Sequence, residues 1–419
     1  MRRRAACLII LCLAASRPAA AEEPLSLEAA YALALKRSET IAIDQEAIKE
    51  AEARFIRAFG TALPNISFVL SEKRQDGTGE SAFTLRRVPE RKFVFTQPIF
   101  SGFREFAAIA GSRAEQKQRR YEKQRAEHIL LVDVANALYL LAELRQDLGT
   151  LEQSRMAVVD RIDELRNRLH LGRSRPSEVA SAESQLRRIE SDLEAARGRE
   201  TSAEQLLAFL TGLPSIDSVA DPGPLPGPSQ PESFYASQAV SRPDVLAVEQ
   251  AWSVARKQVG VEQADLWPNV DLEANYYTER AGVAAQVDWD ALLTVDVPIF
   301  QGGEAVGGVR EALSKARQAK LRSGEAKREA VLDAQNAYAD LQAATAQHAS
   351  LERALAAAEE DYRLQVEDYR LNLVNNLDVL QALQILLNTR RDVIHSRFEV
   401  LRRYWALQAA SGHAVKDAA

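Results

Sequence analysis

The stretch Pro98-Ile99-Phe100-Ser101-Gly102 is repeated 200 residues later as Pro298-Ile299-Phe300-Gln301-Gly302. The same shift places Asp133 on Asp333 farther along the chain. Similarity at a fixed spacing indicates that a structural unit has been duplicated. A unit that cannot bury its own apolar surface must then be completed by its copy or by other chains.

The two copies lose their common spacing at a single place. Upstream, the shift that pairs Pro64-Asn65-Ile66 with Pro268-Asn269-Val270 is 204 residues rather than 200. The copies therefore differ by four residues between Asn65 and Pro98. Prolines and glycines within residues 213–232 are typical of a stiff, extended linker. We therefore divide the chain after residue 21 into a first repeat at 22–212, this linker, a second repeat at 233–413 and a tail at 414–419.

Residues 1–21 are typical of an export signal. Three arginines precede a short apolar run, and Ala19-Ala20-Ala21 forms a small-residue cleavage site. A membrane anchor is the weaker alternative, because the apolar run is too short to cross about 30 Å of hydrocarbon. Cys12 suggests a lipid-anchored relative, but Leu11 stands where a small residue would precede a lipidated cysteine.

Composition limits the classes of function. Both cysteines, Cys7 and Cys12, lie in the predicted signal, so we expect no disulfide and no thiolate metal site in the mature chain. Removing the four arginines of residues 1–21 takes the net charge from −6 to −10. That balance argues against a nucleic-acid partner, since phosphate binding needs an excess of basic residues. No apolar run after the signal is long enough for a transmembrane helix.

Two proline-free stretches predict very long helices. Leucines and alanines recur there in steps of three and four, which is the pattern of a coiled-coil seam. Residues 104–169 alone would make a helix of about 66 residues, or roughly 100 Å. Turns at 172–176 and 372–376 then predict return helices, which gives helical hairpins at 102–212 and 302–412. Two shorter helices are expected at residues 40–62 and 243–266.

Between the shorter and longer helices, the apolar period changes from helical to two. This alternation predicts β-hairpins of long strands at 64–100 and 268–300. A sheet packed on the helices with its acidic face in water is one alternative. The export signal, the strand length and four aromatic residues of the type found at membrane interfaces favour an outer-membrane barrel instead. These aromatic residues are Phe93, Tyr276, Tyr277 and Trp289. Four strands cannot close a barrel, which needs about eight, and an open edge is forbidden in lipid, so the chain must oligomerise.

The order of these elements, together with the duplicated motifs, resembles the TolC-type outer-membrane efflux protein family. The matching motifs are Leu63-Pro64-Asn65 and Trp267-Pro268-Asn269, the two Pro-Ile-Phe-x-Gly stretches, and Arg242-Pro243-Asp244 at the start of the second repeat. The resemblance covers nearly all of residues 24–413. It implies a mainly α-helical fold with a β-barrel part, in which a homotrimer forms one twelve-stranded barrel continued by an α-helical tunnel.

The resemblance also implies a function and partners. The protein would be the outer-membrane channel of a tripartite efflux pump or a type I secretion system in a Gram-negative bacterium. It would bind itself, outer-membrane lipid, a periplasmic adaptor (membrane fusion) protein and an inner-membrane pump or ABC exporter. The exported substrate could be a drug, a metal or a protein. The alternative from another class is a periplasmic coiled-coil scaffold or adaptor without a pore.

No pattern of residues indicates an enzyme, and we expect no catalytic residue, metal site or cofactor. The five histidines are scattered and are expected on helix surfaces: His128, His170, His348, His395 and His413. No glycine-rich phosphate loop follows a strand. Acidic residues mostly keep the spacing of an exposed helix face. The sequence therefore favours a conduit with docking surfaces.

Two sites are expected at the periplasmic end by resemblance to the family. The first is the pair of adaptor-docking turns, Gly172, Arg173, Ser174 and Arg175 in one repeat and Asn372, Leu373, Val374 and Asn375 in the other. The second is the gate, where Asp378 matches a pore-facing acid and Gln381 stands at the family's second acidic position. Tyr369 matches the family's tyrosine, and Glu178 stands for the acid that links neighbouring hairpins. The family's arginine falls on Val374, so Arg173 or Arg175 would have to substitute.

Asp378 has an ordinary structural alternative, because an acid in the first turn of a helix is stabilised by the helix dipole. A third expected site is the lumen of the barrel. Acidic residues alternate with apolar ones along the strands of the second repeat and would line the lumen: Asp271, Glu273, Asp288, Asp290 and Asp296.

Overall fold

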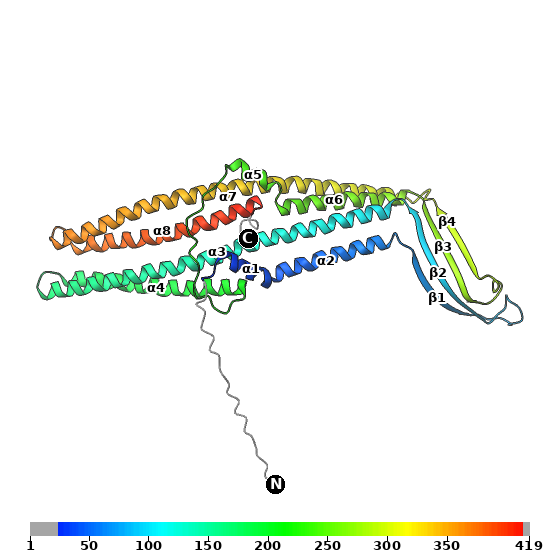
Figure 1. Ribbon diagram of the computed structural model, residues 1–419, viewed down its shortest axis with the longest axis horizontal. Coiled ribbons are helices and arrows are strands. Elements are labelled where there is room, and N and C mark those ends of the chain that lie inside the picture. Colours follow the sequence, from blue (N-terminus) through cyan, green and yellow to red (C-terminus); the bar gives the residue numbers. More distant parts are fainter. Residues whose placement is uncertain (1–23, 414–419) are drawn as a thin grey trace, which may run out of the picture.

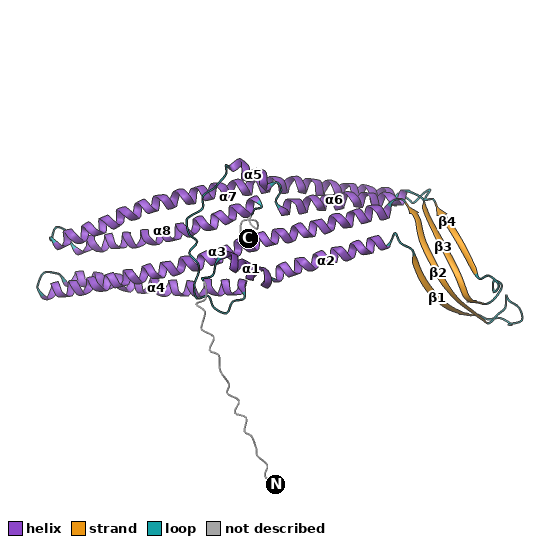
Figure 2. Ribbon diagram, in the orientation of Figure 1, coloured by secondary structure: helices purple, strands orange, loops and turns teal. Residues whose placement is uncertain are grey.

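The computed structural model describes residues 24–413; the predicted signal at 1–21 and the tail at 414–419 lie outside this range. In chain order, its elements are α1 (Leu27–Arg37), α2 (Glu39–Gly60), β1 (Asn65–Arg74), β2 (Arg87–Ser101), α3 (Arg104–His170), α4 (Pro176–Thr211), α5 (Glu232–Ala239), α6 (Pro243–Gln263), the 3-10 turn η1 (Ala264–Leu266), β3 (Asn269–Arg280), β4 (Trp289–Asp296), α7 (Glu304–Arg370) and α8 (Asn376–Ser411). Most of the described chain is helical (Figure 2).

The molecule is a long rod with a small sheet at one end and two helical turns at the other (Figure 1). The helices α3 and α7 run the whole length of the helical part. The shorter helices α2 and α6 lie beside them near the sheet, and α4 and α8 lie beside them near the turns. The rod thus keeps an even thickness, because two short helices in succession match one long helix.

The two long helical hairpins have equal dimensions. Each long helix, α3 and α7, has 67 residues, and each return helix, α4 and α8, has 36. All their bounds differ by the 200 residues seen in the sequence. The two turns have different residues at the position where the backbone is left-handed. Gly172 has φ 66° and Asn372 has φ 59°, a left-handed conformation that glycine and asparagine adopt most readily.

The four strands form one antiparallel sheet in the order β1-β2-β3-β4. In the first hairpin Asn65 pairs with Thr96, and in the second Asn269 pairs with Asp296. The two pairs are equivalent, because Asn269 follows Asn65 by 204 residues and Asp296 follows Thr96 by 200 residues. The four-residue difference between the repeats therefore lies in the connecting loops, at 75–86 and 281–288. Both outer edges of the sheet, on β1 and β4, have no strand partner within the described chain.

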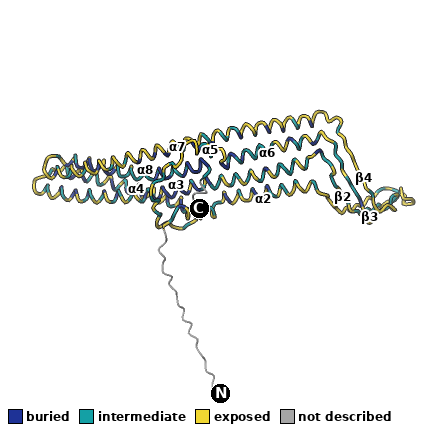
Figure 3. Tube along the Cα trace, turned by 45° about the horizontal axis from the view of Figure 1, so that its top comes forward, coloured by how far each residue is buried: buried dark blue, intermediate teal, exposed yellow. Residues whose placement is uncertain are grey.

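Burial is uneven along the rod. The largest core lies mid-rod, where Leu131, Leu138 and Phe398 are buried among α1, α3, α4 and α8. By contrast, α7 buries only a narrow stripe, made mostly of alanines, and most of its surface is exposed (Figure 3). A helix that packed against neighbours on both sides would bury a wider stripe. None of the helices in residues 24–413 is both long and apolar enough to cross a membrane.

Two short helices were absent from the sequence prediction. Helix α1 packs on the mid-rod core, where the hydroxyl of Tyr31 donates to the carbonyl of Glu127. Helix α5 begins at the end of the predicted linker and packs on α7 through buried Tyr235. The linker itself is held at one end by Arg145, which donates to the carbonyls of Ile216 (2.5 Å) and Asp217 (3.2 Å).

Candidate functional site

Both predicted docking turns lie side by side at the end of the rod that is far from the sheet (Figure 1). Most of their residues are exposed, and Ser174 and Val374 are half-buried. The second turn carries two strongly exposed leucines, Leu373 at 70% and Leu377 at 65%. At the equivalent positions the first turn carries exposed Arg173 and Ser177, and it also carries exposed Arg175. A leucine just before each turn, Leu171 or Leu371, is exposed in both. The two turns therefore present different chemistry to a partner.

The two acids predicted at the gate begin the return helices. The carboxylate of Asp378 accepts the backbone N–H of Asn375 at 3.0 Å, and the Asn375 side chain accepts the N–H of Asp378 in return. Glu178 accepts the backbone N–H of Arg175 at 3.2 Å and the hydroxyl of Ser174 at 2.5 Å. The reciprocal bonds of Asn375 and Asp378 form a capping box, which satisfies free N–H groups at a helix start. Glu178 makes only the carboxylate half of such a box, because the Glu178 N–H donates to the backbone carbonyl of Arg175. Both carboxylates therefore have a structural role here.

A buried arginine joins the two helical hairpins just above the turns. Arg161 of α3 lies over the ring of Tyr369 of α7, with its guanidinium carbon 3.9 Å from the ring centre. Its Nε also donates to the side chain of Asn376, the first residue of α8, at 3.0 Å. Asn376 in turn donates to the backbone carbonyl of Glu178 at 3.5 Å. We call Arg161, Tyr369 and Asn376 the seam clasp.

The seam clasp differs from the arrangement expected at the gate. Tyr369 is where it was predicted, but among the described residues its stacked arginines are Arg161 and Arg168 rather than Arg173 or Arg175. Val374 packs into the apolar core at this end of the rod. Gln381 is exposed on α8. The sequence held one signal for Arg161, because it lies between the apolar seam residues Val158 and Ile162 and is a charge on a buried stripe.

The predicted lumen acids lie on one face of the sheet. Residues paired across antiparallel strands point to the same side, and Asp271 pairs with Thr294, Asn275 with Asp290, and Asn269 with Asp296. Glu273 also shares this face, since the Asn275 amide donates to Glu273 and Asp290 at 3.1 and 3.0 Å. The carbonyl of Asp288 accepts the N–H of Tyr277 beside them.

This polar face is less acidic near the hairpin loops than the sequence suggested. There Arg280 lies 3.6 Å from Glu90 and 3.8 Å from Asp290, and Lys92 lies 3.4 Å from Glu90. Tyr277, expected among the interface aromatics, also lies on this face and donates to Asp290 at 2.7 Å. The opposite face is apolar and exposed. Its members include Ile66, Phe68, Leu70, Phe93, Tyr276, Trp289, Leu293 and Val295.

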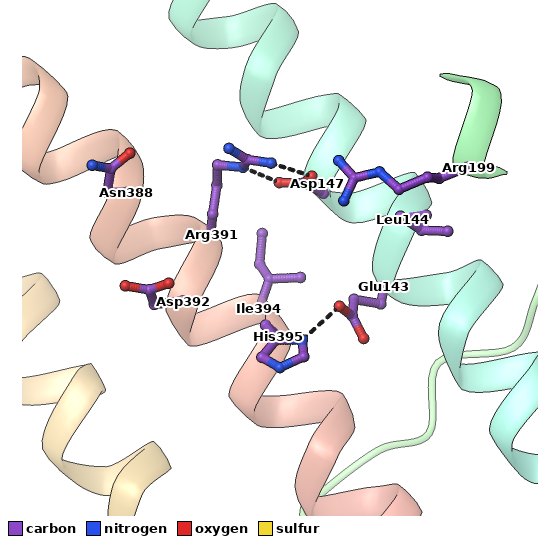
Figure 4. A pocket seen from close by; sticks show the side chains of 9 residues that line it. All are labelled: Glu143, Leu144, Asp147, Arg199, Asn388, Arg391, Asp392, Ile394 and His395. Atoms are coloured by element: carbon purple, nitrogen blue, oxygen red, sulfur yellow. Dashed lines mark hydrogen bonds and ion pairs between the residues drawn. The ribbon is translucent and has the colours of Figure 1, made fainter. Parts of the chain in front are cut away.

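A cavity of about 300 Å³ opens between α3, α4 and α8 (Figure 4). Two of the acids that line it, Asp147 and Glu143, are paired across the two hairpins. Asp147 holds Arg391 through two bonds of 2.6 and 3.0 Å, and Glu143 contacts His395 at 2.8 Å. Arg402 donates to the same Glu143 at 2.7 Å. The cavity is therefore bordered by a salt-bridged seam between the hairpins.

A second charged cluster lies at the middle of the rod. Arg242 is almost fully buried and donates to Asp244 at 2.7 Å, to Asp333 at 3.1 Å and to the carbonyl of Ala410 at 3.4 Å. Burial alone would raise the pKa of Asp244, but bonds from Arg242 and the nearby charges hold that pKa below its usual value. This cluster ties the start of the second repeat to α7 and to the end of α8.

Two histidines correct the expectation that all five lie on helix surfaces. His128 is buried beside Arg125, and its pKa is lowered to about 4 by burial and by that positive charge. His348 is buried and shares a hydrogen bond of 2.9 Å with Ser396. Within residues 24–413, no group of three or more His, Cys, Asp or Glu side chains could hold a metal ion.

Comparison with known proteins finds similarity to one family. Residues 235–413 match the family described as outer membrane efflux protein. This match covers the second repeat, and it agrees with the resemblance inferred from the sequence motifs. It is 24% identical over 264 residues to the outer membrane efflux protein BepC of Brucella suis, and this match covers 59% of the chain and 57% of BepC. The resemblance and the outer-membrane location predicted from the sequence are thus confirmed.

Solved structures show the same fold over almost the whole efflux protein chain. CusC superposes with a TM-score of 0.85 at 17% identity, covering 92% of both chains. The outer membrane protein VceC of Vibrio cholerae superposes with a TM-score of 0.81 at 21% identity, covering 92% of this chain and 96% of VceC. The mainly helical fold with a four-stranded sheet at one end is therefore that of the TolC-type channels.

Proposed function

We propose that this efflux protein is the outer-membrane channel of a tripartite efflux pump or type I secretion system. It would conduct substrates passively, from an inner-membrane transporter to the exterior. The observation that carries this proposal is the sheet at the end of the rod. One face of the sheet is apolar and exposed, the other is polar, and both edges are open. Such a sheet suits lipid only when copies close it into a barrel around water.

Three copies of the chain would supply twelve strands, which is enough to close a barrel. The helical parts would then form a tunnel below it. The narrow buried stripe of α7 supports this, since its exposed sides need neighbours that one chain lacks. The outer face of α2 also carries exposed apolar side chains, among them Ile43 and Ile56. The matching positions and hairpin registers of the two halves favour a duplicated unit that repeats around the tunnel.

The end with the two turns would be the periplasmic mouth. We propose that a periplasmic adaptor docks on Gly172, Arg173, Ser174 and Arg175 of the first turn and on Asn372, Leu373, Val374 and Asn375 of the second. Asp378 and Gln381 would stand near the narrowest part of the mouth. A ring of three carboxylates favours cations and repels itself, so a partner that separates the hairpins would open it. Tyr369 and Glu178 would act through the seam clasp.

The polar face of the sheet would line the lumen of the barrel. Its acids near the helices, Asp271, Glu273 and Asp296, have no arginine or lysine among the ion-pair partners found in residues 24–413. Its outer part is balanced by Lys92 and Arg280. Such a lumen selects weakly by charge. Selection among drugs, metals or proteins would therefore belong to the inner-membrane transporter.

Reconstitution tests this proposal directly. The purified protein is expected to need detergent, to have the native mass of a trimer, and to show a small closed-state conductance in planar bilayers. Asp378→Ala should raise that conductance, because it removes the carboxylate ring, whereas Glu329→Ala, at an exposed position near the middle of α7, should leave it unchanged. Extraction in water with no conductance would favour the pore-free periplasmic scaffold instead.

A further inference from the structure

One row of aromatic side chains crosses the apolar face of the sheet. Phe68 pairs with Phe93, Phe93 with Tyr276, and Tyr276 with Trp289. All four side chains are exposed, and the ring centres of Phe68 and Phe93 lie 4.8 Å apart. Outer-membrane barrels carry such a girdle where hydrocarbon meets the headgroups. Because the helical rod extends from the other end of the sheet (Figure 1), this row marks the outer boundary of the hydrocarbon.

Beyond the aromatic row, the same face of the sheet changes from apolar to basic. Two residues outward along the strands, Leu70 pairs with Arg91, and six residues outward, Arg74 pairs with Arg87. Residues paired across antiparallel strands share a face, and so do residues two apart along one strand. The side chains of Arg74, Arg87 and Arg91 are 82%, 65% and 52% exposed. We call these three residues the arginine patch.

Two carboxylates lie among these arginines and hold them in place. Glu72 accepts two bonds of 3.0 Å from Arg87 and one of 3.2 Å from Arg74, and Glu279 lies 3.0 Å from Arg91. Three arginines against two glutamates leave this part of the face with an excess of one positive charge in each chain. Within residues 24–413, the only bond that Arg74 donates comes from its Nε, so both of its Nη groups are available to a ligand.

We propose that the arginine patch binds the phosphates of a phosphorylated glycolipid, of the lipopolysaccharide type, in the outer leaflet. This inference rests on the proposed function, because only a membrane-embedded barrel turns this face of the sheet toward lipid. A guanidinium group can donate two parallel N–H bonds to one phosphate, which makes arginine well suited to this ligand. The acyl chains of the glycolipid pack on the apolar face below the aromatic row, and its phosphates lie against Arg74, Arg87 and Arg91.

The height of the arginine patch favours a glycolipid over a phospholipid. Six residues along a strand span about 20 Å, which is roughly 15 Å in height at the usual tilt of barrel strands. The headgroup layer of a phospholipid leaflet is only about 5–8 Å thick. Arg91, two residues beyond the aromatic row, lies within such a layer, whereas Arg74 and Arg87 lie beyond it. Phosphates carried on the sugars of a taller headgroup reach both levels.

Lipid retention by the detergent-purified protein tests this proposal. The probes are purified rough-type lipopolysaccharide and the same lipid after chemical removal of its phosphates. Native mass spectrometry counts the lipid molecules that stay bound to the assembled protein. The natural chain is expected to retain the phosphorylated lipid about tenfold better, because only that lipid accepts bonds from the arginines. Equal retention of the two lipids would overturn the proposal, since the acyl chains alone would then explain binding.

Two double variants separate the arginine patch from positive charge in general. Arg74→Gln with Arg87→Gln is expected to lower retention of the phosphorylated lipid about tenfold. Lys73→Gln with Lys92→Gln removes two positive charges from the same two strands but from the opposite face, and should retain the lipid as the natural chain does. Equal losses in the two variants would contradict the proposed face. If the arginine variant does not assemble, the comparison of the two lipids on the natural chain decides the question.

Competition identifies the source of the phosphate. Phosphatidylglycerol and inorganic phosphate, each added at the concentration of the bound lipopolysaccharide, are expected to leave it in place, because the first has a short headgroup and the second has no acyl chains. Displacement by either probe would overturn the glycolipid as the ligand. A trimer that conducts but fails these tests leaves the proposed function intact, whereas a protein that is extracted in water and does not conduct overturns both.

Discussion

At the scale of single residues, Arg161 shows how one side chain can hold two hairpins. Its guanidinium stacks on Tyr369 and bonds to Asn376 and to Glu164. It is 9% exposed, and its Nη2 has no hydrogen-bond partner within the described residues. A buried cation with an unused donor costs free energy while the hairpins are together, and separating the hairpins would give that donor water. We therefore place the seam clasp at the point where opening would begin.

Arg161→Ala is expected to lower the free energy of unfolding by about 2 kcal/mol, because a charged hydrogen bond and a stack on an aromatic ring are lost. It should also raise the closed-state conductance. Arg166→Ala is the control, since that exposed side chain pairs with Glu183 at 2.7 Å and should change stability by less than about 1 kcal/mol. Chemical denaturation and bilayer recording measure both effects. Equal effects of the two variants would rule out the seam clasp.

His128 predicts a dependence of stability on pH. Its pKa is about 4 in the fold, against 6.5 for an unperturbed histidine. Between these values the unfolded chain binds a proton that the folded chain does not, so stability falls as the pH falls from about 6.5 to about 4. The loss attributable to this residue is about 3 kcal/mol. In His128→Gln, the free energy of unfolding should fall less steeply between pH 6.5 and about pH 4 than in the natural chain. Equal dependence on pH in the two proteins would contradict this role of His128.

The residues that carry the candidate gate were only partly predictable. Tyr369 and Asp378 could be placed because their positions relative to the turn follow from the chain itself. The arginines that stack on Tyr369 could not, because Arg161 and Arg168 come from the other repeat, and only tertiary packing brings them near. Asp378 illustrates the opposite case, since its place in the first turn of a helix is a local feature that the sequence already suggested, although the bond with Asn375 was not predicted.

At the scale of elements, the long helices were predicted well because their ends are set locally. Gly172 and Pro176 interrupt the chain at the first turn and asparagines interrupt it at the second, and a seam of leucines and alanines follows each long helix. The short helices α1 and α5 were missed, since 11 and 8 residues form a helix only when neighbours cover them. The two predicted hairpins proved to be one sheet, because β2 and β3 pair across repeats.

The strand β4 carries a test of which face meets lipid. Leu293 and Thr294 are neighbours that point to opposite faces. Leu293→Arg is expected to cost about 2–4 kcal/mol of insertion energy, because it places a charge in hydrocarbon, whereas Thr294→Arg faces water. Recovery of each variant in the outer-membrane fraction gives the comparison. Loss of Thr294→Arg with retention of Leu293→Arg would mean that the faces are reversed.

At the scale of the whole molecule, the outer helices α2 and α7 expose apolar side chains and open positions that no other described part of the same chain covers. The sequence predicted that the chain must associate, because four strands cannot close. It could not predict the contact surface, since α2 and α7 are polar enough to pass as ordinary solvent-facing helices. The structure shows that Gly102 is covered by the end of α6, whereas the equivalent Gly302 is open.

The unequal turns of the two hairpins have a consequence for any protein that caps the mouth. Three assembled chains would present six tips, alternating between an arginine-bearing kind and a leucine-bearing kind. A partner protein that binds by charge would find three equivalent binding sites. A partner that binds every tip would need two different binding modes. The ring of tips would therefore have threefold symmetry for a bound partner, although the helical hairpins of three duplicated chains would number six.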